Sequence, residues 1–266
     1  MQISEAEYQN HNVFKELEEL IEFYNSLSFS ISSWLTTPVS IINIDSRMMS
    51  SIKGTLESIF DILKKGRLND SYSLLRKLYD LIVINIYTNL YLEEDVDLDN
   101  FLNNKVNNWV RGKEKIPSFG TMSKYIIQSK TAGELTSLIY QNGQFKGSIF
   151  EYIRQRCNEH THYLYYYNLL SNDNEIYLRD RLEKLNEFSK DLNDIFILHF
   201  SYLFYVKQHY MGTSDYLDHK ELGLEPPENS EYWVASFIQE TFNFTIKKNR
   251  PDIAQLIIKS TSMELK

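Results

Sequence analysis

Apolar residues recur every three or four positions along most of the chain, which is the spacing of one face of an α-helix. Residues 5–27 interleave such positions with glutamates and predict an amphipathic helix. A second helix is predicted from Asp45, a residue type that caps helices, to a stop at Gly66. A third, from about Asn69 to Tyr91, is apolar at so many positions that we expect it in the centre of the fold.

The region around residues 94–142 is less regular and rich in asparagine. Short helices are indicated at residues 98–110, 120–128 and 131–140, separated by Pro117 and a Ser-Lys-Thr turn. We therefore expect an exposed insertion between the long helices.

Two longer helical segments follow this insertion. Ile149–Leu170 is predicted as one helical run, closed by a Ser-Asn-Asp-Asn turn. From about Glu175 to Met211 the pattern predicts a long helix, and its second half is apolar nearly all round, so it should be buried.

Residues 214–230 contain a glycine and adjacent prolines and form the clearest linker in the chain. Two helices are predicted after it, Glu231–Lys247 and Pro251–Ser262. The predicted fold is therefore all-α: a multi-helix bundle over residues 1–213, with a C-terminal helical hairpin over residues 231–266 packed on it.

Composition agrees with a folded helical protein. Hydrophobic residues make up 42% and charged residues 24% of the 266 residues, which are ordinary values for a globular chain and exclude global disorder. The chain has only 9 glycines and 5 prolines, which argues against many short strands joined by tight turns. The net charge of -8 disfavours a general electrostatic attraction to nucleic acid, so any such binding must be local.

A cytoplasmic location is expected from cysteine usage and from the first residues. Cys157 is the only cysteine, so the chain forms no internal disulfide, and its N-terminus lacks the basic start and apolar core of a signal peptide. The most apolar run, Ile195–Val206, is shorter than the roughly 20 residues needed to cross a bilayer. No membrane partner is expected.

The segment Ile149–Leu170 concentrates side chains suited to proton transfer and phosphate binding. Histidine titrates near neutral pH, and arginine is a planar, permanently charged donor that fits phosphates. On a helical wheel Arg154, Asn158 and His162 lie within about 80° of one another. They share one face and are the preferred functional residues.

His160 and Arg156 lie elsewhere on the same predicted helix. His160 falls in the apolar sector with Cys157, and Arg156 borders that sector. His160 is therefore predicted to be a packed, hydrogen-bonded residue. The alternative for the whole set is a polar helix face in which Arg154 pairs with a carboxylate.

Arg76 and Asp80 stand four residues apart on the predicted central helix. This spacing places them next to each other on one helix face and predicts an ion pair. They are candidates for a supporting layer behind the functional residues.

Arg154 and Arg156 are each followed six residues later by a histidine, His160 and His162. This spacing resembles the arginine-to-histidine motif of the HEPN superfamily, the all-α domains found in many prokaryotic RNase toxins and phage-defence proteins.

A second pattern resembles HEPN-like bacterial families of uncharacterised function. There, a helix bearing an arginine and, four residues later, an acidic residue precedes a helix bearing an asparagine or serine and, four residues later, a histidine. In this chain those positions are Arg76, Asp80, Asn158 and His162. The resemblance covers mainly residues 45–93 and 143–205.

The resemblance implies metal-independent cleavage of RNA, with no metal and no cofactor. A histidine would take the proton from a ribose 2′-hydroxyl, and an arginine would stabilise the charge developing on the phosphate. Asn158 would orient the phosphate or the histidine. The resemblance also implies a bacterial toxin or phage-defence protein, a homodimer with composite sites, and an antitoxin or another defence protein as partner.

Other interpretations use the same residues differently. The acidic net charge favours a non-catalytic all-α module that binds another protein, and a non-catalytic nucleic-acid-binding module is a further alternative. Cys157 is a weak nucleophile candidate because a thiol in an apolar sector resists ionisation. Glu159, His160 and His162 point in three directions on a helix, which disfavours a metal site. The tyrosine run at residues 163–167 is expected to pack with its hydroxyls at the rim, and stacking on bases is the alternative.

Overall fold

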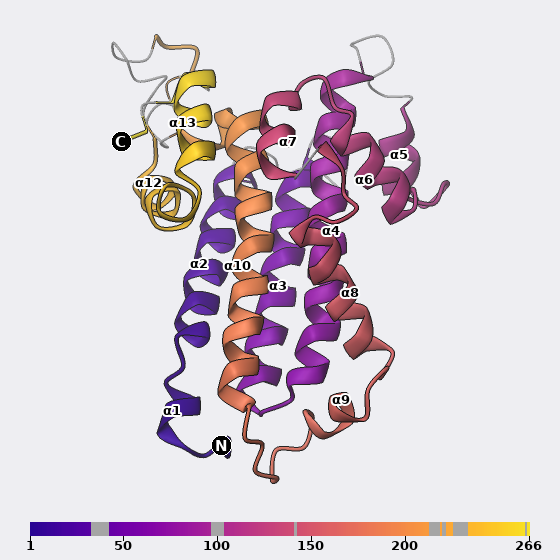
Figure 1. Ribbon diagram of the computed structural model, residues 1–266. Helices are drawn as coiled ribbons and strands as arrows, with labels where there is room; N and C mark the ends of the chain where they lie inside the picture. The colour runs from indigo at the N-terminus through magenta and orange to yellow at the C-terminus, as the bar shows by residue number, and fades with distance from the viewer. Residues whose placement is uncertain are drawn as a thin grey trace.

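The computed structural model describes residues 1–32, 43–96, 104–140, 143–212, 219, 222–225, 234–263 and 265–266. Within these residues the protein is an all-α multi-helix bundle, as predicted, with a single isolated β-bridge between Gly212 and Val234 (Figure 1). None of the helices in this part of the chain combines the length and the apolar character needed to cross a membrane.

Four long helices form the bundle: α2 (Asn12–Ser32), α3 (Ile44–Lys64), α4 (Leu68–Glu94) and α10 (Arg181–Val206) (Figure 1). A short helix, α1 (Ala6–Gln9), precedes α2, and a 3₁₀-helix (Gln208–Met211) follows α10. The apolar periodicity therefore predicted α3 and α4 to within three residues at each end, whereas the ends of α2 and α10 differ from the prediction by five to seven residues.

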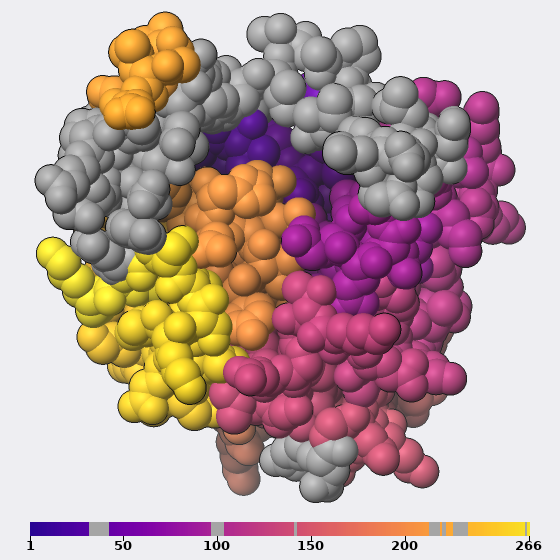
Figure 2. All heavy atoms as spheres, turned by 90° about the horizontal axis from the view of Figure 1, so that it is seen from above, coloured from indigo at the N-terminus to yellow at the C-terminus, as the bar shows by residue number. Residues whose placement is uncertain are grey.

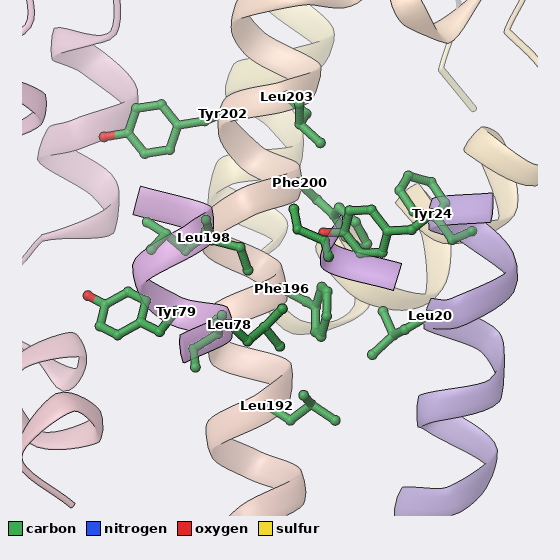
Figure 3. Packing of buried hydrophobic residues seen from close by; sticks show 14 of the residues in the cluster. Leu20, Tyr24, Leu78, Tyr79, Leu192, Phe196, Leu198, Phe200, Tyr202 and Leu203 are labelled. Carbon is green, nitrogen blue, oxygen red and sulfur yellow. The ribbon is translucent and has the colours of Figure 1, made fainter. Parts of the chain in front are cut away.

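The second half of α10 is enclosed by the rest of the bundle, because its side chains are apolar around nearly the whole circumference. Phe196 and Phe200 extend toward Tyr24 of α2, with ring centroids 5.6 and 5.8 Å from the Tyr24 ring (Figure 3). On another side of α10, the Tyr202 hydroxyl lies 2.9 Å from Thr136 Oγ1. The prediction that the second half of this helix is buried is confirmed.

The described part of the predicted insertion contains three short helices, α5 (Lys105–Val110), α6 (Phe119–Ile127) and α7 (Gly133–Ile139), and the start predicted at residue 98 lies outside the described residues. The expectation that this region is exposed is wrong for α6 and α7. Met122, Ile126, Leu135 and Ile139 are buried and belong to the main core. The short amphipathic helices bury their apolar sides against α4 and α10, which the irregular sequence pattern did not indicate.

The C-terminal helices are α12 (Ser236–Thr241), a π-helix (Phe242–Lys247) continuous with it, and α13 (Pro251–Ser260). They pack against α10 through buried Phe242, whose ring centroid lies 5.5 Å from that of Phe204. Seen from above, the C-terminal helices and the segment that includes α7 lie on either side of α10 (Figure 2). The predicted linker at residues 214–230 lies outside the described residues, except for residues 219 and 222–225.

Gly66 makes the tight turn between α3 and α4 with a φ of +80°, and a Cβ there would lie 2.5 Å from Ile3 Cγ2. Replacing Gly66 by alanine should therefore lower the free energy of unfolding by about 1–3 kcal/mol, through backbone strain and overpacking. Gly54→Ala is the matched control, because Gly54 lies within α3 and an added Cβ there would meet no atom within 4 Å. It should stabilise by about 0.5–1 kcal/mol. Urea unfolding of both variants measures the difference, and equal stability of Gly66→Ala and wild type would contradict the steric argument.

Candidate functional site

The candidate functional residues lie on α8 (Ile149–Thr161), which packs against α4. Ser148 caps the start of α8 by accepting a hydrogen bond from the Glu151 backbone N–H, and the Glu151 carboxylate accepts one from the Gly147 N–H. This arrangement resembles a capping box, except that the glutamate binds the N–H of the residue before the cap, and the sequence therefore sets the start of this helix locally.

The prediction of one continuous helix to Leu170 is wrong. The helix α8 ends at Thr161, Tyr163 has a φ of +50°, and a separate short helix, α9 (Tyr166–Leu170), follows. The chain turns back because the Glu159 carbonyl accepts hydrogen bonds from the Leu164 N–H at 3.0 Å and from Asn168 Nδ2 at 2.7 Å. The Asn168 side chain, nine residues further along the chain, thus supplies a hydrogen-bond donor to one of the unpaired carbonyl groups at the end of α8.

Arg76, Asp80 and Asn158 come together where α4 meets α8. Arg76 forms the predicted ion pair with Asp80, and Arg76 Nε donates to Asn158 Oδ1 at 3.1 Å. Three of the four residues in the second HEPN-like pattern are therefore joined by direct contacts.

Arg154 lies beside this group. Its guanidinium carbon is 4.2 Å from the centroid of the Phe119 ring, and that of Arg76 is 5.3 Å from the same centroid. Arg154 Nε is buried and makes no hydrogen bond within the described part of the chain. Burial and the neighbouring Arg76 lower the pKa of Arg154. Among the described residues no carboxylate forms an ion pair with Arg154, and Asp80, whose charge acts on it, is bound to Arg76. We call Arg76, Asp80, Phe119, Arg154 and Asn158 the α4–α8 cluster.

His160 is packed in the core, as predicted. It is 6% exposed, its ring stacks on Tyr72 with centroids 4.1 Å apart, and its Nδ1 donates to Asn69 Oδ1 at 3.0 Å. Burial lowers the pKa of His160 to about 4. The side chain is therefore neutral and enclosed at physiological pH.

Arg156 is neutralised by carboxylates of the neighbouring helix α10. Its Nε donates to Asp191 at 2.7 Å, and its Nη1 forms an ion pair with Glu187, both on α10. In each six-residue register of the first HEPN-like motif, one member is thus engaged elsewhere: His160 in the register that starts at Arg154, and Arg156 in the register that ends at His162.

Of the two candidate histidines, His162 is the exposed one, and it follows the last residue of α8. Eight residues separate it from Arg154, which corresponds to about 12 Å along a helix axis. Among the described residues its side chain forms no hydrogen bond, ion pair or ring contact with the α4–α8 cluster. The structure therefore brings Arg154, Asn158, Arg76 and Asp80 together but leaves His162 apart from them within one chain.

Cys157 is fully buried, and burial raises the pKa of its thiol, which keeps it protonated and inert as a nucleophile. Among the described residues, no three His, Cys, Asp or Glu side chains gather as they would around a metal ion.

The expected packing of the tyrosine run is wrong for most of its members. Tyr163, Tyr165 and Tyr166 are exposed, the last by 78%, and Leu164 beside them is exposed too. Tyr167 differs, because its hydroxyl donates to Asp180 at 2.8 Å. The break after α8 turns the exposed side chains away from the core, and the result is an exposed aromatic surface around α9, which we call the α9 surface.

The sequence pattern did not reveal a buried polar network that the structure contains. His199 of α10 is fully buried, and its two ring nitrogens contact the Tyr24 hydroxyl at 2.6 Å and Asn85 Oδ1 at 2.9 Å. Asn85 in turn donates to Asp45 at 2.8 Å, and so does Tyr210, also at 2.8 Å. The available signal was a histidine and an asparagine at apolar positions of two otherwise apolar helices, which indicates mutual pairing.

Comparison with known proteins assigns no family: no family model, curated protein or solved structure matches this chain.

Proposed function

We propose that this protein binds RNA through the α4–α8 cluster and cleaves it without a metal, as an HEPN-like endoribonuclease. The observation that carries the proposal is the guanidinium of Arg154, which has no counter-charge of its own among the described residues. A partly buried cation is normally neutralised by a carboxylate or by a bound anion, because desolvation penalises an isolated charge. The cluster holds two guanidinium groups and one carboxylate, and an anionic ligand would balance it.

A phosphate suits this position for geometric reasons. An arginine presents several donors in a plane and binds two phosphate oxygens at once. The side chain is held over Phe119, so little conformational entropy is lost on binding. On a protein with a net charge of -8, such a local site is the form that phosphate recognition has to take.

His162 supplies the proton transfer in this proposal. It is exposed and lies at the end of the helix that carries Arg154. The separation of about 12 Å along the helix is larger than a single phosphate spans, so we propose a homodimer in which Arg154 of one chain and His162 of the other flank the scissile bond. Asn158, held by Arg76, would contact the phosphate or orient it.

The test is RNA binding and cleavage in EDTA, with a fluorescein-labelled single-stranded RNA. Arg154→Ala should weaken binding about 10-fold or more, the value of a charged hydrogen bond. His162→Ala should leave binding near wild type and slow cleavage about 100-fold or more, the usual contribution of a general base. Arg179→Ala is the matched control, because Arg179 is an exposed arginine outside the cluster.

Two outcomes would contradict the proposal. If RNA binding is the same for wild type, Arg154→Ala and Arg179→Ala, the cluster is not a phosphate site. If cleavage survives both Arg154→Ala and His162→Ala, the catalytic assignment is wrong even where RNA binds.

A second candidate function is a non-catalytic protein-interaction module, and the α9 surface favours it. Exposed tyrosines and leucines in one contiguous segment are typical of protein interfaces and unusual on the surface of a monomer. Acidic residues flank the segment, among them Glu159, Asp173 and Glu175, which disfavours RNA there. Self-association that depends on Tyr166, in a protein that binds no RNA, would support this candidate over the first.

A further inference from the structure

A groove with a volume of about 1180 Å³ runs along α2 and α10, next to the C-terminal helices. Its walls come from α2, α10, the junction of α7 and α8, and the π-helix. In Figure 1 the C-terminal helices and α7 stand above this stretch of α10, and Figure 2 shows them on its two sides. No residue of the α4–α8 cluster lines the groove, so it is a separate feature of the fold.

The groove presents apolar side chains that nothing in the described residues covers. Phe244 on its rim is 71% exposed, and Leu138 and Ile149 on the opposite wall are exposed as well. Phe244 belongs to the π-helix, a rare geometry that occurs frequently at functional sites. An exposed aromatic residue on such a turn, facing a groove, is typical of a binding surface.

Asp194 of α10 lines the same groove and has no cationic partner in the described part of the chain. Its Oδ2 is shut off from solvent and accepts no hydrogen bond from these residues. Arg250, the nearest candidate on the C-terminal side, donates instead to Asp252 at 2.6 Å and to the Leu138 carbonyl at 2.6 Å. Lys190, one turn earlier on α10, acts on Asp194 through the longer-range attraction of its charge and not through a direct ion pair.

The remaining charges leave the groove with an excess of carboxylates. Lys15 pairs with Glu19, which also lines the groove, whereas Arg250 pairs with Asp252, which does not. The whole lining holds five carboxylates and four cations, namely Glu16, Glu19, Glu22, Asp194 and Glu240 against Lys15, Lys190, Lys248 and Arg250. A ligand that carries positive charge beside apolar groups is complementary to this lining.

We propose that the groove binds an amphipathic helical segment of a partner protein, with its apolar residues against Phe244 and a lysine or arginine paired with Asp194. The length of the groove favours a helix over a small amine. Its residues on α2 extend from Asn12 to Ser26, about 21 Å along the helix axis, which matches about four turns of a partner helix. A small ligand would leave most of this length unfilled.

Asp194 should lower the free energy of unfolding of the unbound protein, because residues that serve binding are often destabilising in the absence of the ligand. Burial raises the pKa of Asp194 to about 6, with Asp191 acting in the same direction and Lys190 and Arg250 opposing it. Asp194→Asn should therefore raise the melting temperature by a few degrees at pH 7.5 while it weakens peptide binding. A purely structural aspartate would show the opposite effect on stability.

The test is selection of a phage-displayed library of 16-residue peptides on the full-length protein. Enriched peptides should carry apolar residues at i, i+3, i+4 and i+7 together with lysine or arginine. Binding of a fluorescein-labelled enriched peptide should fall at least about 10-fold for both Asp194→Asn and Phe244→Ala. It should be unchanged for the controls Glu183→Gln and Tyr177→Ala, which are exposed residues outside the groove.

The proposal is wrong if no peptide of this pattern is enriched, or if the enriched peptide binds Asp194→Asn and Phe244→Ala as tightly as wild type. Since the groove and the α4–α8 cluster share no residues, RNA binding by the groove variants should match wild type. A negative result for peptide binding would therefore leave the proposed RNA site untouched, and the reverse also holds.

Discussion

Lowering the pH from 7 to 4 should reduce the free energy of unfolding of this protein by on the order of 5 kcal/mol, because two neutral histidines are enclosed in its core. Burial lowers the pKa of His199 to about 3 and that of His160 to about 4. In the unfolded chain both should titrate near about 6.5. Below that pH both histidines are protonated in the unfolded state and remain neutral in the folded state. The free energy of unfolding therefore decreases as the pH falls from about 6.5 toward 4.

Each histidine contributes a slope of up to about 1.4 kcal/mol per pH unit in this range. Asp194 increases the free energy of unfolding as the pH falls. Its pKa is raised to about 6 in the folded protein, which therefore binds this proton at a higher pH than the unfolded chain does. The contribution of each histidine is therefore measured as a difference between variants. Urea unfolding at pH 7, 6, 5 and 4 should show a shallower dependence for His160→Gln and for His199→Gln than for wild type.

The slope is the informative quantity, since the cost of losing a core side chain is the same at every pH. His162→Gln is the matched control, because the exposed His162 meets solvent in both states. If the slopes of the His160 and His199 variants equal that of wild type, the histidines are not the source of the acid sensitivity.

Asp45→Ala should destabilise the protein by about 3–5 kcal/mol, the second largest effect we expect. Asp45 is buried at the start of α3 and accepts hydrogen bonds from Asn85 and Asn89 of α4 and from the Tyr210 hydroxyl. Removing the carboxylate leaves two buried amide donors and the partly buried Tyr210 hydroxyl without an acceptor, and each unpaired donor carries a desolvation penalty.

Asp61→Ala provides the comparison for this variant, because Asp61 lies on the exposed side of the same helix. It should change the free energy of unfolding by less than about 0.5 kcal/mol. Urea unfolding at pH 7.5 compares the two. Similar stabilities for both variants would show that the buried network contributes little.

Local rules predicted the features that depend on neighbours in sequence. The periodicity of apolar residues located the long helices, and the four-residue spacing of Arg76 and Asp80 predicted their ion pair. The helical wheel also separated His160, which is buried, from His162, which is exposed. Each of these features is set within one or two helical turns.

Features that depend on distant residues could not be predicted in this way. The break after Thr161 is stabilised by Asn168, whose side chain reaches back to the end of α8. The sequence left Arg156 as a candidate site residue. In the structure it is paired with Glu187 and Asp191, which belong to a helix some thirty positions further along the chain. A wheel gives the direction of a side chain from its own helix, but it does not say which helix stands opposite.

By itself, the sequence determined the all-α class, the positions of the long helices and the concentration of arginine, asparagine and histidine on one segment. Only the tertiary structure decided which of those side chains are neutralised. In the folded protein Arg156 is paired with a carboxylate and His160 is buried. Arg154 lies over Phe119 and has no counter-charge among the described residues. The physical reason is that helix formation depends on local backbone and side-chain preferences, whereas burial and charge pairing depend on helices that the chain brings together from far apart.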